Sequence, residues 1–116
     1  MSIERIDPNQ TMSRAVVNNG VVYVCGLTAD DQTASMKDQT ANVLQKIDGY
    51  LAKAGTDKSK LLTAMVYVSD MSKKGEMNDA WHEWVDPANP PTRATVGTVL
   101  GSPETLVEIV VSASLD

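Results

Sequence analysis

The sequence predicts an α+β protein in which a mixed β-sheet carries two helices on one face, in the order ββαβαββ. Two segments, near residues 36–54 and 73–85, repeat apolar residues every three or four positions, as amphipathic helices do. Runs rich in β-favouring residues surround these segments, and clusters of Gly, Pro and Asn separate the runs. The 116 residues, 42% of them hydrophobic, suffice for one core, so we expect a single domain over residues 1–116.

The N-terminal part predicts a short edge strand followed by a hairpin. Residues 3–7 form the edge strand and end in a turn cluster. Two β runs, at 12–17 and 21–25, flank Asn19-Gly20. An Asn-Gly pair between two such runs favours a tight hairpin turn, because both residues tolerate positive φ.

The two helices and the strand between them have clear boundaries in the sequence. Ser35 is placed to cap the start of the first helix, and Gly55 is placed to end it in a left-handed conformation. Three prolines after residue 85 end the second helix. Residues 61–68 are almost continuously apolar, so we expect a central strand buried on both faces.

The last quarter of the chain predicts two further strands. The pair Pro90-Pro91 removes two backbone donors and leads into an extended run at 92–100. Residues 101–104 are typical of a turn, and a Val-rich run follows at 106–115. We expect the two runs to pair as an antiparallel hairpin.

Each of these runs contains one charged residue among apolar neighbours, Arg93 in the first and Glu108 in the second. In the expected hairpin Glu108 lies opposite Val96 or Gly97. The backbone sites of Arg93 and Glu108 are then on the order of 10 Å apart, within reach of one small ligand. The turn leaves one residue of register open, so the sequence does not decide whether the two side chains share a face.

The final strand also predicts self-association. Val107, Ile109, Val110 and Val111 are apolar at consecutive positions, so both faces of this strand favour burial. Two helices cover only one face of the sheet. We therefore expect a homo-oligomer, with a number of subunits that the residues themselves do not specify.

Charge and composition argue against several classes of function. The net charge is −5 and the lysines and arginines are dispersed, which disfavours a nucleic-acid partner. No apolar run approaches the roughly 20 residues that cross a bilayer, so we expect no membrane partner. The N-terminus lacks the pattern of a secretory signal, and we expect a cytoplasmic protein. A single cysteine excludes an intramolecular disulfide and a multi-cysteine metal site.

Four motifs together resemble the Rid (YjgF-type) family of reactive-intermediate enamine/imine deaminases, over nearly the whole chain. They are Asn19-Gly20-Val21-Val22-Tyr23-Val24-Cys25-Gly26, Met77-Asn78-Asp79-Ala80-Trp81, Pro90-Pro91-Thr92-Arg93 and Leu106-Val107-Glu108-Ile109. The resemblance implies a chorismate-mutase-like fold and a homotrimer with clefts between its subunits. It also implies a small carboxylate-bearing substrate. The sequence names no cofactor, and the expected chemistry requires none.

The resemblance assigns catalysis to Arg93 and Glu108. Arg93 would clamp the substrate carboxylate, for which a planar guanidinium is well suited. Glu108 would position the water that attacks the C=N carbon. The competing interpretations are a structural ion pair between these two residues, or a Glu108 that only faces solvent.

Five further positions are implied to line the substrate site: Met12, Cys25, Gly26, Asn78 and Thr95. Met12 stands where the family's principal branch has Tyr, and Thr95 stands where it has Cys, which affects substrate identity more than reaction class. Cys25 replaces a Ser of many relatives and is otherwise a small buried hydrophobe. Asn78 is otherwise an exposed helical residue, and Gly26 otherwise only ends a strand.

The expected function is therefore hydrolysis of a 2-aminoacrylate-like enamine or a larger 2-imino acid to the 2-keto acid and ammonia. The alternative is a trimer of the same fold that binds a keto acid or similar metabolite without turnover. The direction of Glu108 separates the two hypotheses: facing the same cleft as Arg93 favours catalysis, and facing elsewhere favours binding.

Overall fold

A computed structural model describes residues 2–116 and confirms the predicted α+β class. Six strands form one mixed sheet in the order β1-β2-β3-β6-β4-β5. The strands are β1 (Glu4–Ile6), β2 (Ala15–Asn18), β3 (Val21–Val24), β4 (Leu61–Val68), β5 (Thr92–Gly97) and β6 (Val107–Ser114). The helices are α1 (Met36–Ala54) and α2 (Lys74–Trp84), with short 3-10 turns η1 (Lys58–Lys60) and η2 (Met71–Lys73).

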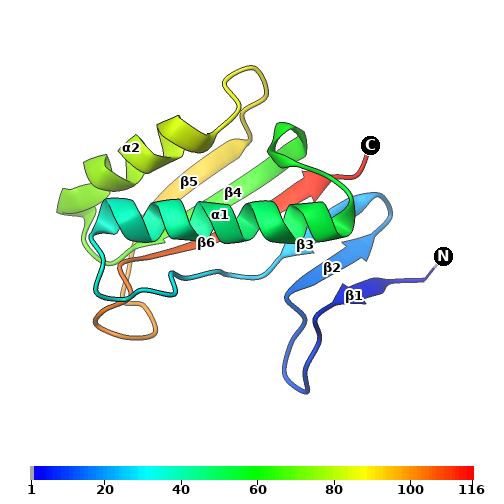
Figure 1. Cartoon of the computed structure of the whole chain (residues 1–116), viewed down its shortest axis with the longest axis horizontal. Coiled ribbons are helices and arrows are strands. Elements are labelled where there is room, and N and C mark those ends of the chain that lie inside the picture. The colour runs from blue at the N-terminus through cyan, green and yellow to red at the C-terminus, as the bar shows by residue number, and fades with distance from the viewer. Residues whose placement is uncertain (1) are drawn as a thin grey trace.

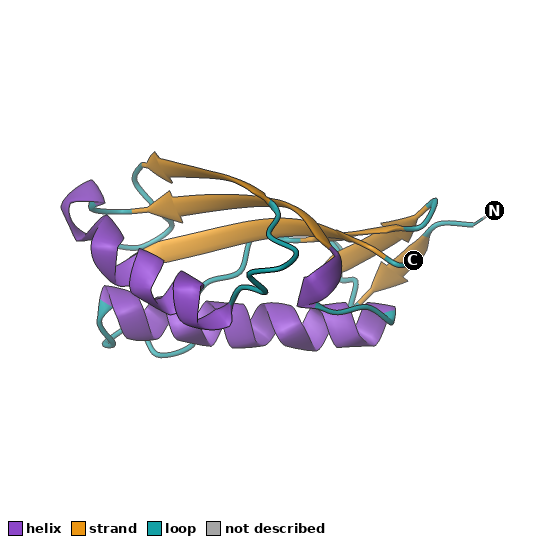
Figure 2. Cartoon of the chain, turned by 90° about the horizontal axis from the view of Figure 1, so that it is seen from above, coloured by secondary structure: helices purple, strands orange, loops and turns teal. Residues whose placement is uncertain are grey.

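The molecule has two layers. Figure 1 shows α1 and α2 side by side across the sheet, and Figure 2 shows that both lie on the same side of it. The other side of the sheet carries no helix from residues 2–116 (Figure 2). We call these sides the helix face and the open face, and their existence confirms the predicted arrangement of the helices.

The N-terminal strands pair as the sequence predicts. β1 pairs antiparallel with β2, and β2 pairs antiparallel with β3. Asn19 and Gly20 form the connecting turn with φ of 51° and 78°, the positive values that a two-residue hairpin turn requires.

Both ends of α1 follow the predicted caps. The Ser35 side chain accepts a hydrogen bond from the Asp38 amide at 3.1 Å. Gly55 has φ of 89°, and its amide donates to the Ala52 carbonyl at 3.0 Å. Only a residue that tolerates positive φ ends a helix in this way without strain.

The predicted hairpin between the last two strands is wrong, because β4 lies between them. β4 pairs with β5 in parallel and with β6 antiparallel. Tyr67 of β4 has Glu108 on one side and Val96 on the other. The expected alignment of Glu108 with Val96 therefore holds across three strands instead of two. With β4 in this place, both of its edges are paired with neighbouring strands, as a central apolar strand requires.

The core lies between the sheet and the helices. Alternate residues of β4 and β6 face the helices and are buried, as are the inward residues of α1. The core residues of these three elements are Met36, Val43, Leu44, Ile47, Leu51, Leu61, Ala64, Val66, Val68, Val107, Ile109, Val111 and Ala113.

The expected burial of β4 on both faces is wrong for the single chain. Leu62 is 43% exposed, and the neighbouring Thr63 is exposed as well. The run is continuous in composition, but helices cover only one of its faces.

Residues 2–116 have two further general properties. No helix among them is both long and apolar enough to cross a membrane. No three or more His, Cys, Asp or Glu side chains in this range are grouped so as to hold a metal ion.

Replacement by alanine should have opposite effects on stability at two glycines, one inside α1 and one at its C-terminal cap. Gly49 lies on the exposed side of the helix interior with open space around its Cβ position, so Gly49→Ala should raise the free energy of unfolding by about 0.5–1 kcal/mol. Gly55→Ala should lower it by about 1 kcal/mol, because alanine is strained at positive φ. Urea unfolding monitored by circular dichroism measures both. Equal effects of the two changes would contradict the assigned helix end.

Candidate functional site

Arg93 lies on the edge strand β5 and points to the helix face. Its partner in the parallel ladder is Ala64, which is buried against the helices, and paired residues of a ladder point to the same side. The guanidinium carbon lies 5.3 Å from the centre of the Trp81 ring, and Nη1 lies 3.8 Å from the Met77 sulfur. The sheet and α2 together therefore hold the guanidinium at the edge of the molecule.

The guanidinium has no carboxylate partner within residues 2–116, since none of the salt bridges there involves Arg93. Partial burial lowers its pKa from the ordinary value, because a charge is less stable away from water. An arginine still keeps its charge at neutral pH. The N–H donors of the Arg93 guanidinium are thus charged, positioned by an aromatic ring and available to an anion.

Thr95 lies on the same face of β5 as Arg93, two residues further along the strand. Gly97, two residues further again, lies against Met71, since a Cβ on Gly97 would be 2.7 Å from the Met71 Cγ. Arg93 contacts Trp81 near the other end of α2, so β5 and the segment from Met71 to Trp81 run in opposite directions. Thr95 therefore faces the middle of this segment, which contains Asn78.

Both of these residues hold a polar atom without a partner. Within residues 2–116, Thr95 Oγ1 and Asn78 Oδ1 are screened from solvent and make no hydrogen bond. Buried polar groups are usually satisfied, so these two atoms stand out as unused hydrogen-bonding capacity on this face. Arg93, Thr95 and Asn78 form what we call the helix-face group.

Glu108 belongs to the opposite side of the sheet. Its neighbours Val107 and Ile109 are fully buried on the helix face, so Glu108 points to the open face, where it is half-buried. Its carboxylate lies against the backbone of Gly26. A Cβ on Gly26 would overlap Glu108 Oε2 and lie 3.0 Å from Cδ. Gly26 is thus needed for the position of this carboxylate.

A pair of hydrogen bonds holds this contact in place. Leu27 and Ile109 exchange backbone hydrogen bonds at 3.0 and 3.1 Å, which fixes the chain after β3 against β6. Cys25 is half-buried, and its amide donates to the Arg14 carbonyl at 2.8 Å. Glu108, Gly26 and Cys25 form what we call the open-face group.

Met12 lies apart from both groups, on the loop that joins β1 and β2. It is exposed, and its carbonyl accepts a hydrogen bond from the Asn9 amide at 2.9 Å. Arg14 connects this loop to Cys25, so Met12 lies at the same end of the sheet as the open-face group.

The structure therefore divides the predicted site residues between two faces of one sheet. The ion pair between Arg93 and Glu108 is absent from residues 2–116, because the side chains point in opposite directions. Sequence reasoning missed Trp81 as the support of Arg93, since a tryptophan on the inner face of a helix is typical of a core residue.

Comparisons with known proteins agree with this fold and these motifs. The chain matches the sequence model of the Endoribonuclease L-PSP family over residues 2–115. It is 43% identical to a RutC family protein of Haemophilus ducreyi over 114 residues, which are 98% of this chain and 97% of that protein. It is 36% identical to the RutC family protein YoaB of Escherichia coli, covering 99% and 100% of the two chains.

The crystal structure of a YjgF family member from Neisseria meningitidis has the same fold. Its TM-score is 0.96 at 36% identity, and the match covers 100% of this chain and 97% of that one. The class defined by fold and motifs is thus that of small α+β proteins with a one-sided helical layer. The chain belongs to the YjgF/Rid family, which also carries the names RutC and L-PSP. The resemblance seen in the sequence is confirmed.

The unpartnered hydroxyl of Thr95 predicts an unusual stability effect. Thr95→Val keeps the shape and removes a buried hydroxyl that bonds to nothing within residues 2–116, so the free energy of unfolding should stay equal or rise by about 1 kcal/mol. Thr56→Val is the matched control and should lower it by about 1 kcal/mol, because Thr56 Oγ1 donates to the Ser114 carbonyl at 2.7 Å. Urea unfolding measures both. If Thr95→Val lowered the free energy of unfolding as much as Thr56→Val, the Thr95 hydroxyl would be hydrogen-bonded in solution.

Proposed function

We propose that this protein hydrolyses small enamines and 2-imino acids to the 2-keto acid and ammonia, in a cleft formed between copies of the chain. The observation that carries the proposal is the charged, unpaired guanidinium of Arg93, which α2 holds at the edge of the sheet. Membership of the YjgF/Rid family supports it, because many members are enamine/imine deaminases.

Arg93 would bind the carboxylate of the substrate. Guanidinium and carboxylate match as two parallel hydrogen bonds, which fixes the orientation of the ligand as well as its position. The Trp81 ring under the guanidinium limits its motion, so less freedom is lost on binding. Thr95 and Asn78 lie on the same face and offer two further unused hydrogen-bonding atoms.

Glu108 would serve as the general base. As its carboxylate takes a proton from water, the oxygen attacks the carbon of the protonated C=N bond and the π electrons move to nitrogen. The proton then passes from Glu108 to that nitrogen, and Glu108 takes the hydroxyl proton as the C–N bond breaks, which leaves the keto acid and ammonia. An enamine follows the same reaction steps once protonation of its carbon has converted it to the imine. A protonated imine is already electrophilic, so orientation and one base suffice.

Two copies would build each site. Arg93 and Glu108 face opposite sides of one sheet, and the open face exposes large apolar side chains. Tyr23 is 53% exposed, Leu62 43% and Val96 38%. A second copy packed on this face buries them and brings the β5 edge of one copy towards Glu108 of another. The family resemblance favours a homotrimer built in this way.

The second candidate is a trimer that binds a keto acid or similar metabolite without turnover. The separation of Arg93 from Glu108 within one chain favours it, because Arg93 alone suffices to hold a carboxylate. The name of the matching family refers to RNA cleavage. The net charge of −5 disfavours RNA as a partner here, since binding to phosphates depends on a basic surface.

The first test compares the release of keto acid from imino acids generated in situ by an amino-acid oxidase. Arg93→Lys should lower kcat/KM by about 10- to 100-fold, mainly through KM, because a lysine keeps the charge but loses the fork. Glu108→Gln should lower kcat by about 10²- to 10⁴-fold. Gly26→Ala should also lower kcat, because the new methyl displaces the Glu108 carboxylate.

Matched controls for this test come from the opposite edge of the sheet. Arg5→Lys and Glu4→Gln change the same residue types on the exposed strand β1 and should leave both constants unchanged. Size-exclusion chromatography with light scattering verifies that all variants assemble alike. A wild-type protein that only matches the spontaneous rate would exclude the deaminase and leave the binding protein.

Mixing two inactive variants tests the site between copies. Arg93→Ala and Glu108→Gln, unfolded together and refolded, should regain about a quarter of the wild-type activity, since random mixing places both native residues at that share of sites. The same variants refolded separately are the control and should stay inactive. No recovery on mixing would mean that one copy supplies both residues.

A further inference from the structure

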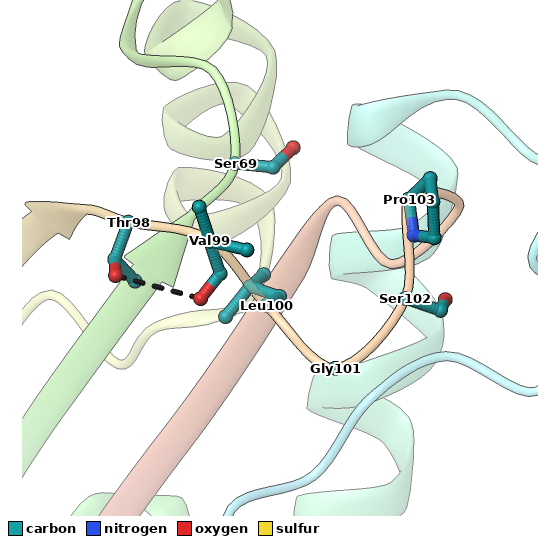
Figure 3. A pocket seen from close by; sticks show the side chains of 7 residues that line it. All are labelled: Ser69, Thr98, Val99, Leu100, Gly101, Ser102 and Pro103. Atoms are coloured by element: carbon teal, nitrogen blue, oxygen red, sulfur yellow. Dashed lines mark hydrogen bonds between the residues drawn. The ribbon is translucent and has the colours of Figure 1, made fainter.

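A cavity of about 360 Å³ lies beyond the ends of β4 and β5 (Figure 3). It is lined by Ser69, Thr98, Val99, Leu100, Gly101, Ser102 and Pro103. Val99 is 93% exposed, which is unusual for a large aliphatic residue. An apolar lining with a few hydroxyl groups, at this volume, is typical of a small-molecule site.

The backbone ladder connects this cavity to the sheet. The Ser69 amide donates to the Leu106 carbonyl at 3.0 Å, and the Thr98 amide donates to the Val68 carbonyl at 3.0 Å. These bonds continue the pairing of β4 with β6 on one side and with β5 on the other. Leu106, Ser69 and Thr98 therefore form a further row across the three strands.

This row lies next to Glu108 on the same face. Ser69 and Thr98 each come two residues after a member of the row that joins Glu108, Tyr67 and Val96. Side chains two positions apart share a face, and two residues span about 7 Å. On the open face, Ser69 thus lies one strand across and two residues along from Glu108, and Thr98 lies two strands across.

Hydrogen bonds from the helix side hold the cavity wall in place. Gln32 Oε1 accepts from Thr105 Oγ1 at 2.7 Å and from Ser102 Oγ at 3.2 Å. The fully buried Gln39 accepts from the Leu106 amide at 3.0 Å. The loop between β5 and β6 is therefore anchored at its far end, and the cavity is formed without a ligand.

We propose that this cavity holds the side chain of the substrate and selects 2-imino acids with a bulky aliphatic side chain. The inference rests on the proposed function, in which the attacked carbon lies at Glu108. The substituent on that carbon then extends along the sheet towards the neighbouring row, where Val99, Leu100 and Pro103 line the cavity. A small substituent, as in the imino acid from alanine, leaves these residues without contact.

The test measures selectivity, the ratio of kcat/KM for imino acids generated from leucine and from alanine. The leucine-derived compound carries three more carbon atoms, so the wild-type ratio should be about tenfold or higher. Ser69→Leu fills the cavity from its rim and should lower the ratio about tenfold. His82→Leu adds the same side chain on the exposed side of α2 and should leave the ratio unchanged.

Two results would overturn the side-chain cavity while leaving the deaminase intact. One is an active wild-type enzyme whose ratio Ser69→Leu does not change, or which favours the alanine-derived compound. The other is dissociation of the oligomer by Ser69→Leu in light scattering, because the cavity would then receive a residue of a second copy.

If the wild-type protein accelerates neither reaction, the proposed deaminase activity is wrong, and a binding measurement then tests the side-chain cavity by itself. Trp81 and Trp84 are the two tryptophans of the chain, and Trp81 supports Arg93, so their fluorescence reports ligands at this site. 4-Methyl-2-oxopentanoate should bind more tightly than pyruvate, and Ser69→Leu should abolish the difference. Equal affinities in wild type would overturn the side-chain cavity as well.

Discussion

The position of β4 between β5 and β6 is the constraint on which the rest of the structure depends. Its ladder to β5 is parallel and its ladder to β6 is antiparallel, so both C-terminal strands take their register from the same eight residues. That register directs Ala64 and Arg93 to the helix face, and Tyr67 and Glu108 to the open face. Because side chains alternate along a strand, a shift of one residue would exchange the two faces.

The two faces have different physical roles in the single chain. The helix face carries the core, in which alternate residues of the central strands pack against α1 and α2. This packing holds the inner turns of α2, and with them Trp81, beneath the guanidinium of Arg93. The open face carries Glu108 against Gly26 and leaves large apolar side chains exposed. Stability is therefore concentrated on one face, while the other keeps a carboxylate, apolar surface and a cavity.

This division gives the proposed chemistry a structural rationale. A carboxylate clamp and a general base that shared one face of one chain would neutralise each other as an ion pair. On opposite faces, both groups stay unpaired until copies assemble and a ligand enters. The unused hydrogen-bonding atoms of Thr95 and Asn78, and the anchored cavity beside Glu108, are further groups that the single chain leaves without partners. Assembly and substrate binding would supply partners to all of them.

Local signals in the sequence determined the elements and their boundaries. Ser35, Gly55 and the Asn19-Gly20 turn act within a few residues, and the apolar periods show which side of each helix is buried. The family motifs likewise identified Arg93 and Glu108 by their spacing. Tertiary structure alone decided that β4 separates β5 from β6, that the two charges face apart, and that Trp81 supports Arg93. Strand order and facing depend on pairing between segments far apart in the chain, and no local propensity encodes which neighbour a strand will choose.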